Sequence, residues 1–339
     1  MTMHCHVVVA DLFLPSDIAG EACAGLDLPA LEWLLARAQA ASLQVDTLEE
    51  WFCHAFGVGN QAVAPVTLQA DGIEPGQYYW LRADPVYIQM QRDKMILRPE
   101  VALAADEAAQ LCASLNAHFA DEGLHFFAPH PQRWYLRLDS APEIVTRTLA
   151  QVAGRNVHRH LPQGADALRW HQIFNEIQML FYDHAVNVAR EDRGELPINS
   201  VWFWGGGQAT KELSWPFAKI IADSALAAAF AQAAGIPCTA LPENLEPDLT
   251  GQNENLLIVW DDLRRSLQQG ELHAWRDSVL RLERNCVALQ RALRAGRLSQ
   301  LTLEVLNAGD GRSFVLTRAA SWKLWRRAKP LARYAHAAE

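Results

Sequence analysis

The sequence has 339 residues, of which 50% are hydrophobic, so it can bury a large core and we expect two domains. Its net charge of −9 argues against general binding to nucleic acids. No apolar run reaches the roughly 18 residues that a membrane span needs, and residues 1–15 lack the layout of a signal peptide, which predicts a cytoplasmic protein. The six cysteines show no CxxC spacing and are expected to be reduced thiols of the core.

The N-terminal part of the chain begins with a buried strand followed by helices. Residues 6–11 are apolar and predict the strand, and amphipathic helices are expected in residues 27–41 and 47–57. Residues 63–139 then change towards short strands and one long helix that ends at Gly123. This change in character indicates an inserted α+β domain.

The C-terminal half alternates strands and helices, which predicts an α/β fold with a mostly parallel sheet flanked by helices. A long helix is expected in residues 164–191, returning to the core sheet. The strands expected in this sheet are residues 199–204, 236–241, 255–260 and 301–308. The expected domains are a discontinuous core of residues 1–62 and 163–318, the insertion of residues 63–162, and a C-terminal tail of residues 319–339.

The stretch from Asp183 to Gly207 combines a polar helix end, a turn, an apolar strand and three glycines. Gly194 can take the left-handed conformation that ends a helix, and Pro197 prevents the helix from continuing. The glycines that follow the strand are Gly205, Gly206 and Gly207. Ligands bind at the carboxyl ends of strands in parallel sheets, and glycines expose N–H groups that attract anions. On the glycines alone, however, a tight turn is the favoured interpretation.

The same stretch resembles the archaeal type of cofactor-independent phosphoglycerate mutases. In that family a helix ending in His-Pro-x-Asn leads through a basic turn and Pro-x-Asn into a strand and a glycine loop. The matching positions here are His184, Asn187, Arg190, Gly194, Pro197, Asn199, Gly205 and Gly207. Arg82 lies in a segment similar to the family's inserted domain. The resemblance covers most of the chain, extends to the degenerate bacterial group of RpfE-type regulatory proteins, and implies an alkaline-phosphatase-like fold.

The resemblance also implies a site in which Asp and His hold two divalent metal ions that activate a Ser or Thr. The carboxylates at the matching positions are Asp11, Asp261 or Asp262, and Asp310. No histidine accompanies them, and the nucleophile position falls near Thr47 or Leu48, outside any Gly-Ser sequence. Trp204 replaces the arginine of the mutases' glycine loop. We therefore expect the nucleophile and the metal site to be lost, with no cofactor.

Two functions are compatible with these features. The favoured one is a catalytically silent regulatory protein that binds a phosphorylated or carboxylated metabolite between its domains, or a protein partner, with a homodimer as one possibility. The expected anion contacts are Arg82, Arg133, His184, Asn187, Arg190 and Asn199. The alternative is a divergent mutase or phosphatase that acts on a small phosphorylated carboxylate with Mn or Zn. In that case the four aspartates must converge with an imidazole.

The C-terminal tail is basic and aromatic, with two tryptophans, Trp322 and Trp325, among lysines and arginines. Such a segment is compatible with a patch for a membrane surface, an anion or a partner. The favoured interpretation is a solvated helix that packs both tryptophans on the core.

Overall fold

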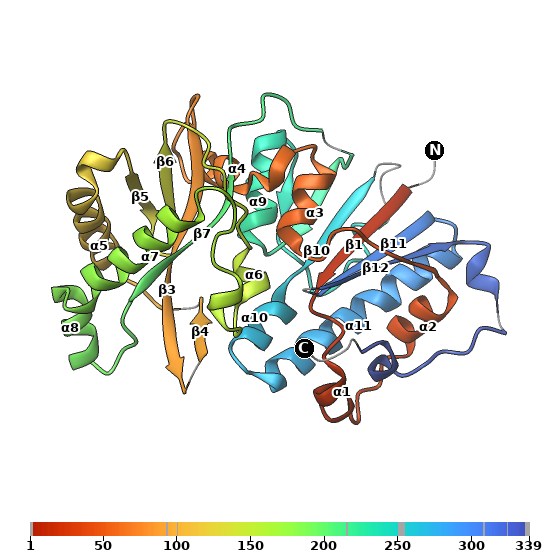
Figure 1. The fold of residues 1–339 in the computed structure, drawn as a ribbon. Coiled ribbons are helices and arrows are strands. Elements are labelled where there is room, and N and C mark those ends of the chain that lie inside the picture. The colour runs from red at the N-terminus through yellow and green to blue at the C-terminus, as the bar shows by residue number, and fades with distance from the viewer. Residues whose placement is uncertain are drawn as a thin grey trace. The chain divides into compact units, whose positions relative to one another are not determined.

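The computed structural model describes residues 3–92, 94–99, 101–214, 216–249, 255–307, 309–323 and 325–335. The chain divides into two compact units (Figure 1). We call residues 1–56 with 214–339 the core unit, and residues 57–213 the inserted unit. Among the described helices, none combines the length and the apolar character of a membrane span.

The core unit contains a seven-stranded sheet in the order β2-β12-β11-β1-β10-β8-β9. The five strands from β11 to β9 are parallel, whereas β12 and β2 run antiparallel at one edge. This confirms the expected mostly parallel sheet. The strands are β1 (Met3–Ala10), β2 (Gln39–Ser42), β8 (Lys219–Ala222), β9 (Cys238–Thr239), β10 (Leu256–Trp260), β11 (Leu298–Asn307) and β12 (Asp310–Thr317).

Helices cover both faces of this sheet. Successive side chains of each strand point to opposite faces, so each strand contributes side chains to both layers. The odd-numbered residues of β1 join one large apolar cluster with the helices α2 and α11. On the other face, His6 contacts Trp51 of α3. The ring centroids of Phe52 of α3 and Phe230 of α9 are 5.0 Å apart. The helices are α1 (Ser16–Ala22), α2 (Pro29–Arg37), α3 (Leu48–Ala55), α9 (Ala225–Ala234), α10 (Asp262–Gln268) and α11 (Leu272–Arg294).

The inserted unit is built on an antiparallel sheet in which the long strand β3 pairs with β4, β6 and β7, and β5 pairs with β6. The helices α5 and α7 pack on one face and α4 packs on the other. The strands are β3 (Tyr79–Gln91), β4 (Lys94–Arg98), β5 (His125–His130), β6 (Arg133–Leu138) and β7 (Ser200–Gly207). The helices are α4 (Val63–Ala70), α5 (Ala105–His118), α6 (Leu149–Val152), α7 (Ala167–Tyr182) and α8 (Ala185–Asp192).

Two expectations for the second half of the chain were wrong. The strand expected at residues 199–204 is β7, and it pairs antiparallel with β3 in the inserted unit instead of joining the core sheet. Its apolar sequence predicts a buried strand but does not select the strand with which it pairs. In the structure that partner is the 13-residue strand β3. The helix expected at residues 164–191 is divided into α7 and α8, because His184 caps a new helix with its ring nitrogen. Residues 163–213 thus belong to the inserted unit.

The tail does not form the expected helix. In its described residues, 319–323 and 325–335, it forms only the short 3₁₀ segments η4 (Ala320–Trp322) and η5 (Leu331–Tyr334). The side chains of Trp322 and Trp325 are 62% and 76% exposed, so the expectation that they pack on the core was wrong. The last part of the expected tail, residues 336–339, lies outside the described residues.

Candidate functional site

Two of the expected metal-site carboxylates follow neighbouring strands of the core sheet. Asp11 comes directly after β1 and Asp261 directly after β10, and these strands are parallel partners with Val9 opposite Trp260. The two carboxylates therefore lie at the same edge of the sheet. Asp11 has a φ of 56°, a left-handed conformation that few residues other than glycine adopt, so its backbone turns sharply at this edge.

An arginine lies among these carboxylates. Arg264 is in the first turn of α10, which begins directly after Asp261. Its Nε lies 3.2 Å from Oδ2 of Asp11, and its Nη1 lies 3.2 Å from Oε1 of Glu49 on α3. Burial lowers the pKa of this guanidinium, but the charges of Glu49, Asp11 and Asp261 outweigh the burial and hold the pKa above its ordinary value. The edge therefore carries a permanent internal cation.

The remaining expected positions do not join this cluster. Asp262 pairs with Arg281 of α11, and Asp310 pairs with Arg312 of its own strand. Thr47, at the expected nucleophile position, is fully buried and its hydroxyl caps α3 by accepting from the N–H of Glu50 at 3.3 Å. Within the described ranges, no three His, Cys, Asp or Glu side chains are arranged to hold a metal ion. The donor set does not fit a pair of divalent ions.

Arg82, an expected anion contact, is buried in a charge cluster of the inserted unit. Its Nε and Nη2 donate to Oδ1 of Asp84 at 3.0 and 2.7 Å, and Trp204 donates its indole N–H to Oδ2 at 2.8 Å. Burial lowers the pKa of Arg82, but the adjacent Asp84 carboxylate outweighs it, and the pKa lies above its ordinary value. Arg82 is therefore already neutralised by a partner two residues away on β3.

Arg133 of β6 forms a second pair, with Asp71 after α4. Its Nε and Nη2 lie 2.9 and 2.5 Å from the two carboxylate oxygens, and the hydroxyl of Tyr135 donates to Oδ2 at 2.6 Å. Burial raises the pKa of Asp71, but these hydrogen bonds outweigh it and hold the pKa below its usual value. The Arg133 side chain is 28% exposed, against 7% for Arg82 and 3% for Arg190. Of these three arginines, Arg133 is the most accessible to an anion.

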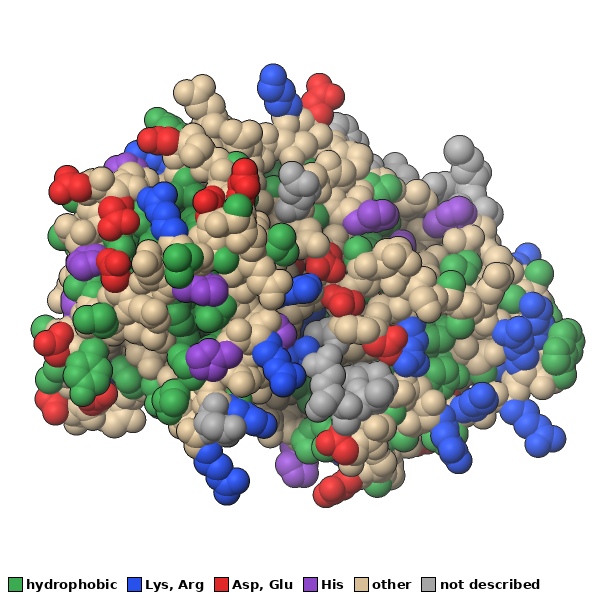
Figure 2. Space-filling model, in the orientation of Figure 1, with side chains coloured by type: hydrophobic (Ala, Val, Ile, Leu, Met, Phe, Trp, Pro, Cys, Tyr) green, Lys and Arg blue, Asp and Glu red, His purple; other side chains and the backbone are tan. Residues whose placement is uncertain are grey.

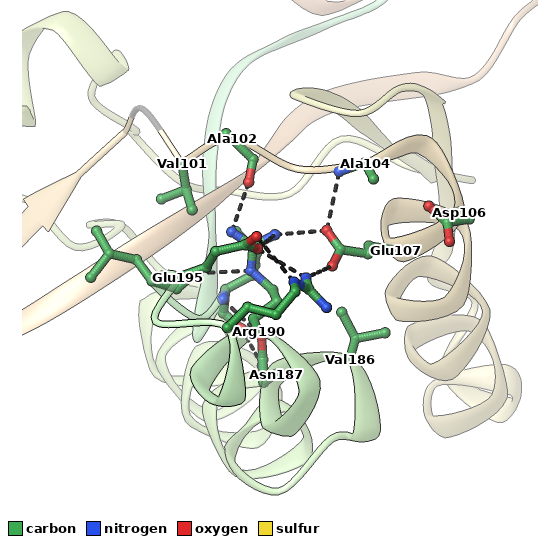
Figure 3. Close-up of polar contacts among 12 residues, drawn as sticks. Val101, Ala102, Ala104, Asp106, Glu107, Val186, Asn187, Arg190 and Glu195 are labelled. Atoms are coloured by element: carbon green, nitrogen blue, oxygen red, sulfur yellow. Dashed lines mark hydrogen bonds and ion pairs between the residues drawn. The ribbon is translucent and has the colours of Figure 1, made fainter.

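Arg190 connects α8 to the segment that enters α5 (Figure 3). Its Nη1 donates to Glu107 at 2.6 Å, its Nη2 to the carbonyl of Ala102 at 2.7 Å and its Nε to the carbonyl of Leu196 at 2.9 Å. Glu107 also accepts from the N–H of Ala104. All three nitrogens of the guanidinium thus bind groups of the protein itself, which is the bonding of a structural arginine.

The other polar residues of the matching motif bind backbone. Asn187 donates to the carbonyls of Phe181 and Ile198, both at 2.7 Å, and accepts from the N–H of Ile198. Asn199 bonds both the N–H and the carbonyl of Ile88 on β3. His184 caps α8 and its second ring nitrogen lies 2.9 Å from the hydroxyl of Ser114. The motif therefore joins α7, α8 and β7 to the sheet.

The two groups of expected anion contacts lie at different ends of β7. Ser200 pairs with Val86 at its beginning, close to Asn199, and Trp204 pairs with Arg82. Trp204 is four positions after Ser200 along the extended strand, a distance of about 13 Å. The structure brings Arg82 and Arg133 together with two aspartates, and it groups Arg190, Asn187, His184 and Asn199 elsewhere.

The triple glycine lies inside strand β7, where packing is tight. A Cβ at Gly207 would lie 2.2 Å from that of Ala62, and a Cβ at Gly206 would lie 2.5 Å from the hydroxyl of Tyr79. Gly205 has a φ of 62°. The glycines therefore allow close approach of backbone to neighbouring side chains, which accounts for this sequence without a ligand.

We expect Gly207→Ala to lower the free energy of unfolding by about 1–3 kcal/mol, because the new methyl overlaps Ala62 and the backbone must shift. Gly59→Ala is the matched control in the same unit, since a Cβ there meets nothing within 4 Å. Urea unfolding of both variants measures the difference. Equal stability of the two variants would contradict a packing role for Gly207.

The partners of the expected residues were not predicted from the sequence. Arg264 has a local signal, because it lies three residues after Asp261 where the mutase pattern has other residues. Asp84 also has a local signal, because it follows Arg82 by two residues on the same face of β3, whereas the pairing of Asp71 with Arg133 depends on the sheet and on the end of α4.

Comparisons with known proteins identify relatives at low identity. No protein-family model matches the chain. The chain is 22% identical over 203 residues to a 2,3-bisphosphoglycerate-independent phosphoglycerate mutase of Methanosarcina mazei, covering 54% of this chain and 49% of that enzyme. It is 26% identical over 111 residues to the enzyme of the same name from Methanosarcina barkeri, covering 32% and 28%. The aligned part therefore spans less than half of each relative.

The fold has a solved counterpart. The PH0037 protein from Pyrococcus horikoshii aligns over 98% of this chain and 92% of its own, with a TM-score of 0.50 and 8% identity. This likeness concerns the fold alone. The sequence matches make the chain similar, at low identity, to 2,3-bisphosphoglycerate-independent phosphoglycerate mutases.

Proposed function

We propose that this protein is a catalytically silent relative of cofactor-independent phosphoglycerate mutases that acts by binding, in a regulatory role. The observation that carries the proposal is the ion pairing of Arg264 with Asp11 and Glu49, beside Asp261. Asp11 and Asp261 lie at the sheet edge at which the resemblance implies metal ligands. A guanidinium already supplies the positive charge there.

The chemistry of the donors supports the same conclusion. Two divalent ions that are 3.5–4 Å apart, as in typical two-metal sites, need several carboxylates or imidazoles turned towards one point. Here Asp262 and Asp310 are paired with their own arginines. The candidate nucleophile, Thr47, is buried and its hydroxyl caps a helix. A metal pair would have to displace Arg264 and leave its charge buried without partners, which is unfavourable.

A binding role leaves the ligand open to two classes, a phosphorylated or carboxylated metabolite and a protein partner. Arg133 is the best placed of the expected anion contacts, because its guanidinium is part exposed and lies close to Arg82 in the same cluster. We also infer a cytoplasmic location. The six cysteines are free thiols and four of them are buried, and the cytoplasm keeps thiols reduced.

The proposal is tested with the wild-type protein by calorimetric titration with Mn²⁺ and Zn²⁺ and by assays for 3-phosphoglycerate mutase and phosphatase activity. We expect no tight ion binding and no turnover, because the carboxylates are already neutralised by Arg264. Tight binding with turnover that disappears in Asp11→Ala would overturn the proposal in favour of a divergent enzyme. A thermal-shift comparison of 3-phosphoglycerate with sulfate, repeated on Arg133→Ala, then distinguishes a metabolite ligand from a protein partner.

A further inference from the structure

The C-terminal part of the core unit carries a surface that none of the functions above uses. Residues 318–333 contain six basic residues and no acidic residue. The basic residues are Arg318, Lys323, Arg326, Arg327, Lys329 and Arg333. All of them except the half-buried Lys323 are exposed, and so are Trp322 and Trp325 between them. A protein with a net charge of −9 therefore has a local region of opposite sign.

Neighbouring helices add further positive charge. Arg37 of α2 and Arg294 of α11 lie over the ring of Trp33, 4.8 and 4.7 Å from its centroid. Burial and the nearby charge of Arg294 lower the pKa of Arg37. The guanidinium of Arg318 lies against Gly296, which comes two residues after Arg294 and directly before Arg297 in the sequence. The basic tail is thus continuous with a basic helix end, and we call the two together the basic-aromatic patch.

The acidic side chains that contact this region of the described structure include Glu246 and Glu32. Glu246 lies 3.9 Å from Arg291 and 3.7 Å from Arg297, which are loose pairs, and Glu32 is bonded to the N–H of Leu331. Figure 2 shows lysine and arginine side chains gathered with hydrophobic side chains over the C-terminal segment that follows β12. At physiological salt, charges more than about 8 Å away are largely screened, so the acidic remainder of the protein does not cancel the patch.

We propose that the basic-aromatic patch docks on an anionic phospholipid surface. Exposed tryptophans are costly in water but stable at the boundary between lipid headgroups and acyl chains, where the indole N–H meets water. The flanking lysines and arginines match the negative charge of the headgroups, and their aliphatic stems can lie along the same boundary. Trp322 ends the 3₁₀ segment η4, Trp325 follows three residues later in the sequence and both rings are exposed, so one contact can bury both.

A nucleic acid is the other polyanion that such a patch could meet, since bases stack on tryptophan. The patch alternates apolar and basic side chains over a short segment instead of following a long strand of phosphates. The membrane is therefore the occupant that the exposed rings favour, and duplex or single-stranded DNA becomes an outcome of the test. This inference does not depend on the proposed function.

The test is sedimentation of the full-length protein with vesicles of phosphatidylcholine alone or mixed equally with phosphatidylglycerol. We expect binding to the mixed vesicles only, with a blue shift of tryptophan fluorescence. The Trp322→Ala/Trp325→Ala variant should lower the partition coefficient roughly tenfold. The Arg327→Glu/Lys329→Glu variant should lower it at least as much, because insertion of the rings and attraction to the anionic headgroups both contribute to binding.

Matched controls come from the inserted unit, which also exposes apolar and basic side chains. Met179→Ala/Tyr182→Ala removes exposed apolar groups, and Arg169→Glu/Lys211→Glu reverses exposed charges. Both controls should bind as the wild type does. Equal binding to neutral vesicles, no binding to either kind, equal losses in the controls, or retention of DNA in place of vesicles would each overturn the proposal.

Discussion

Replacing Arg264 by methionine is expected to lower the free energy of unfolding by about 3–5 kcal/mol at neutral pH, because Asp11 and Glu49 then lose their shared, part-buried cation. Arg265→Met is the matched control, since Arg265 is exposed on the same helix. The control substitution should change the free energy of unfolding by no more than about 0.5 kcal/mol. Urea unfolding monitored by fluorescence measures both variants.

The free energy of unfolding that Arg264→Met loses should become smaller as the pH falls. Burial raises the pKa of Asp261, and Arg264 opposes this, so the substitution raises that pKa further. A carboxyl whose pKa is raised by folding stabilises the folded state below its ordinary pKa, and this contribution disappears as the pH rises through the folded pKa. The variant should therefore approach the stability of Arg265→Met as the pH falls towards 4. A deficit that is constant between pH 7 and pH 4.5 would contradict this account.

The second large effect is expected for Arg82→Met. The substitution leaves Asp84 buried with hydrogen bonds from Trp204 and Trp134 but without its cation, at a cost of about 3–5 kcal/mol. The matched control is Arg133→Met, which breaks a similar pair with Asp71 near solvent and should cost only about 1–2 kcal/mol. Thermal and urea unfolding at pH 7 compare the two.

Similar costs for both substitutions would show that burial does not decide the strength of these pairs. Asp84→Asn/Arg82→Met provides a further check, because removing both charges should recover part of the loss. If the double variant is no more stable than Arg82→Met, the cost comes from lost packing of Arg82 against Tyr135 and Trp204 instead of from the uncompensated charge.

The sequence predicted the elements whose signal is local. The strand β10 is a continuous apolar run and β1 ends in one, and such runs are typical of a parallel sheet that is covered on both faces. The strand β7 shows the limit of this reasoning. It was recognised as a strand, but its assignment to the core sheet was wrong because hydrophobic runs do not select their partners.

The amino-acid sequence by itself determined that Asp11 and Asp261 follow two buried strands, since each lies at the end of an apolar run. Only the tertiary structure decided that Arg264 lies between Asp11 and Glu49, which are separated from it by more than two hundred residues of chain. Ion pairs act over a few ångströms in space and leave no periodic signal along the chain. Which charges are neutralised is therefore decided by folding.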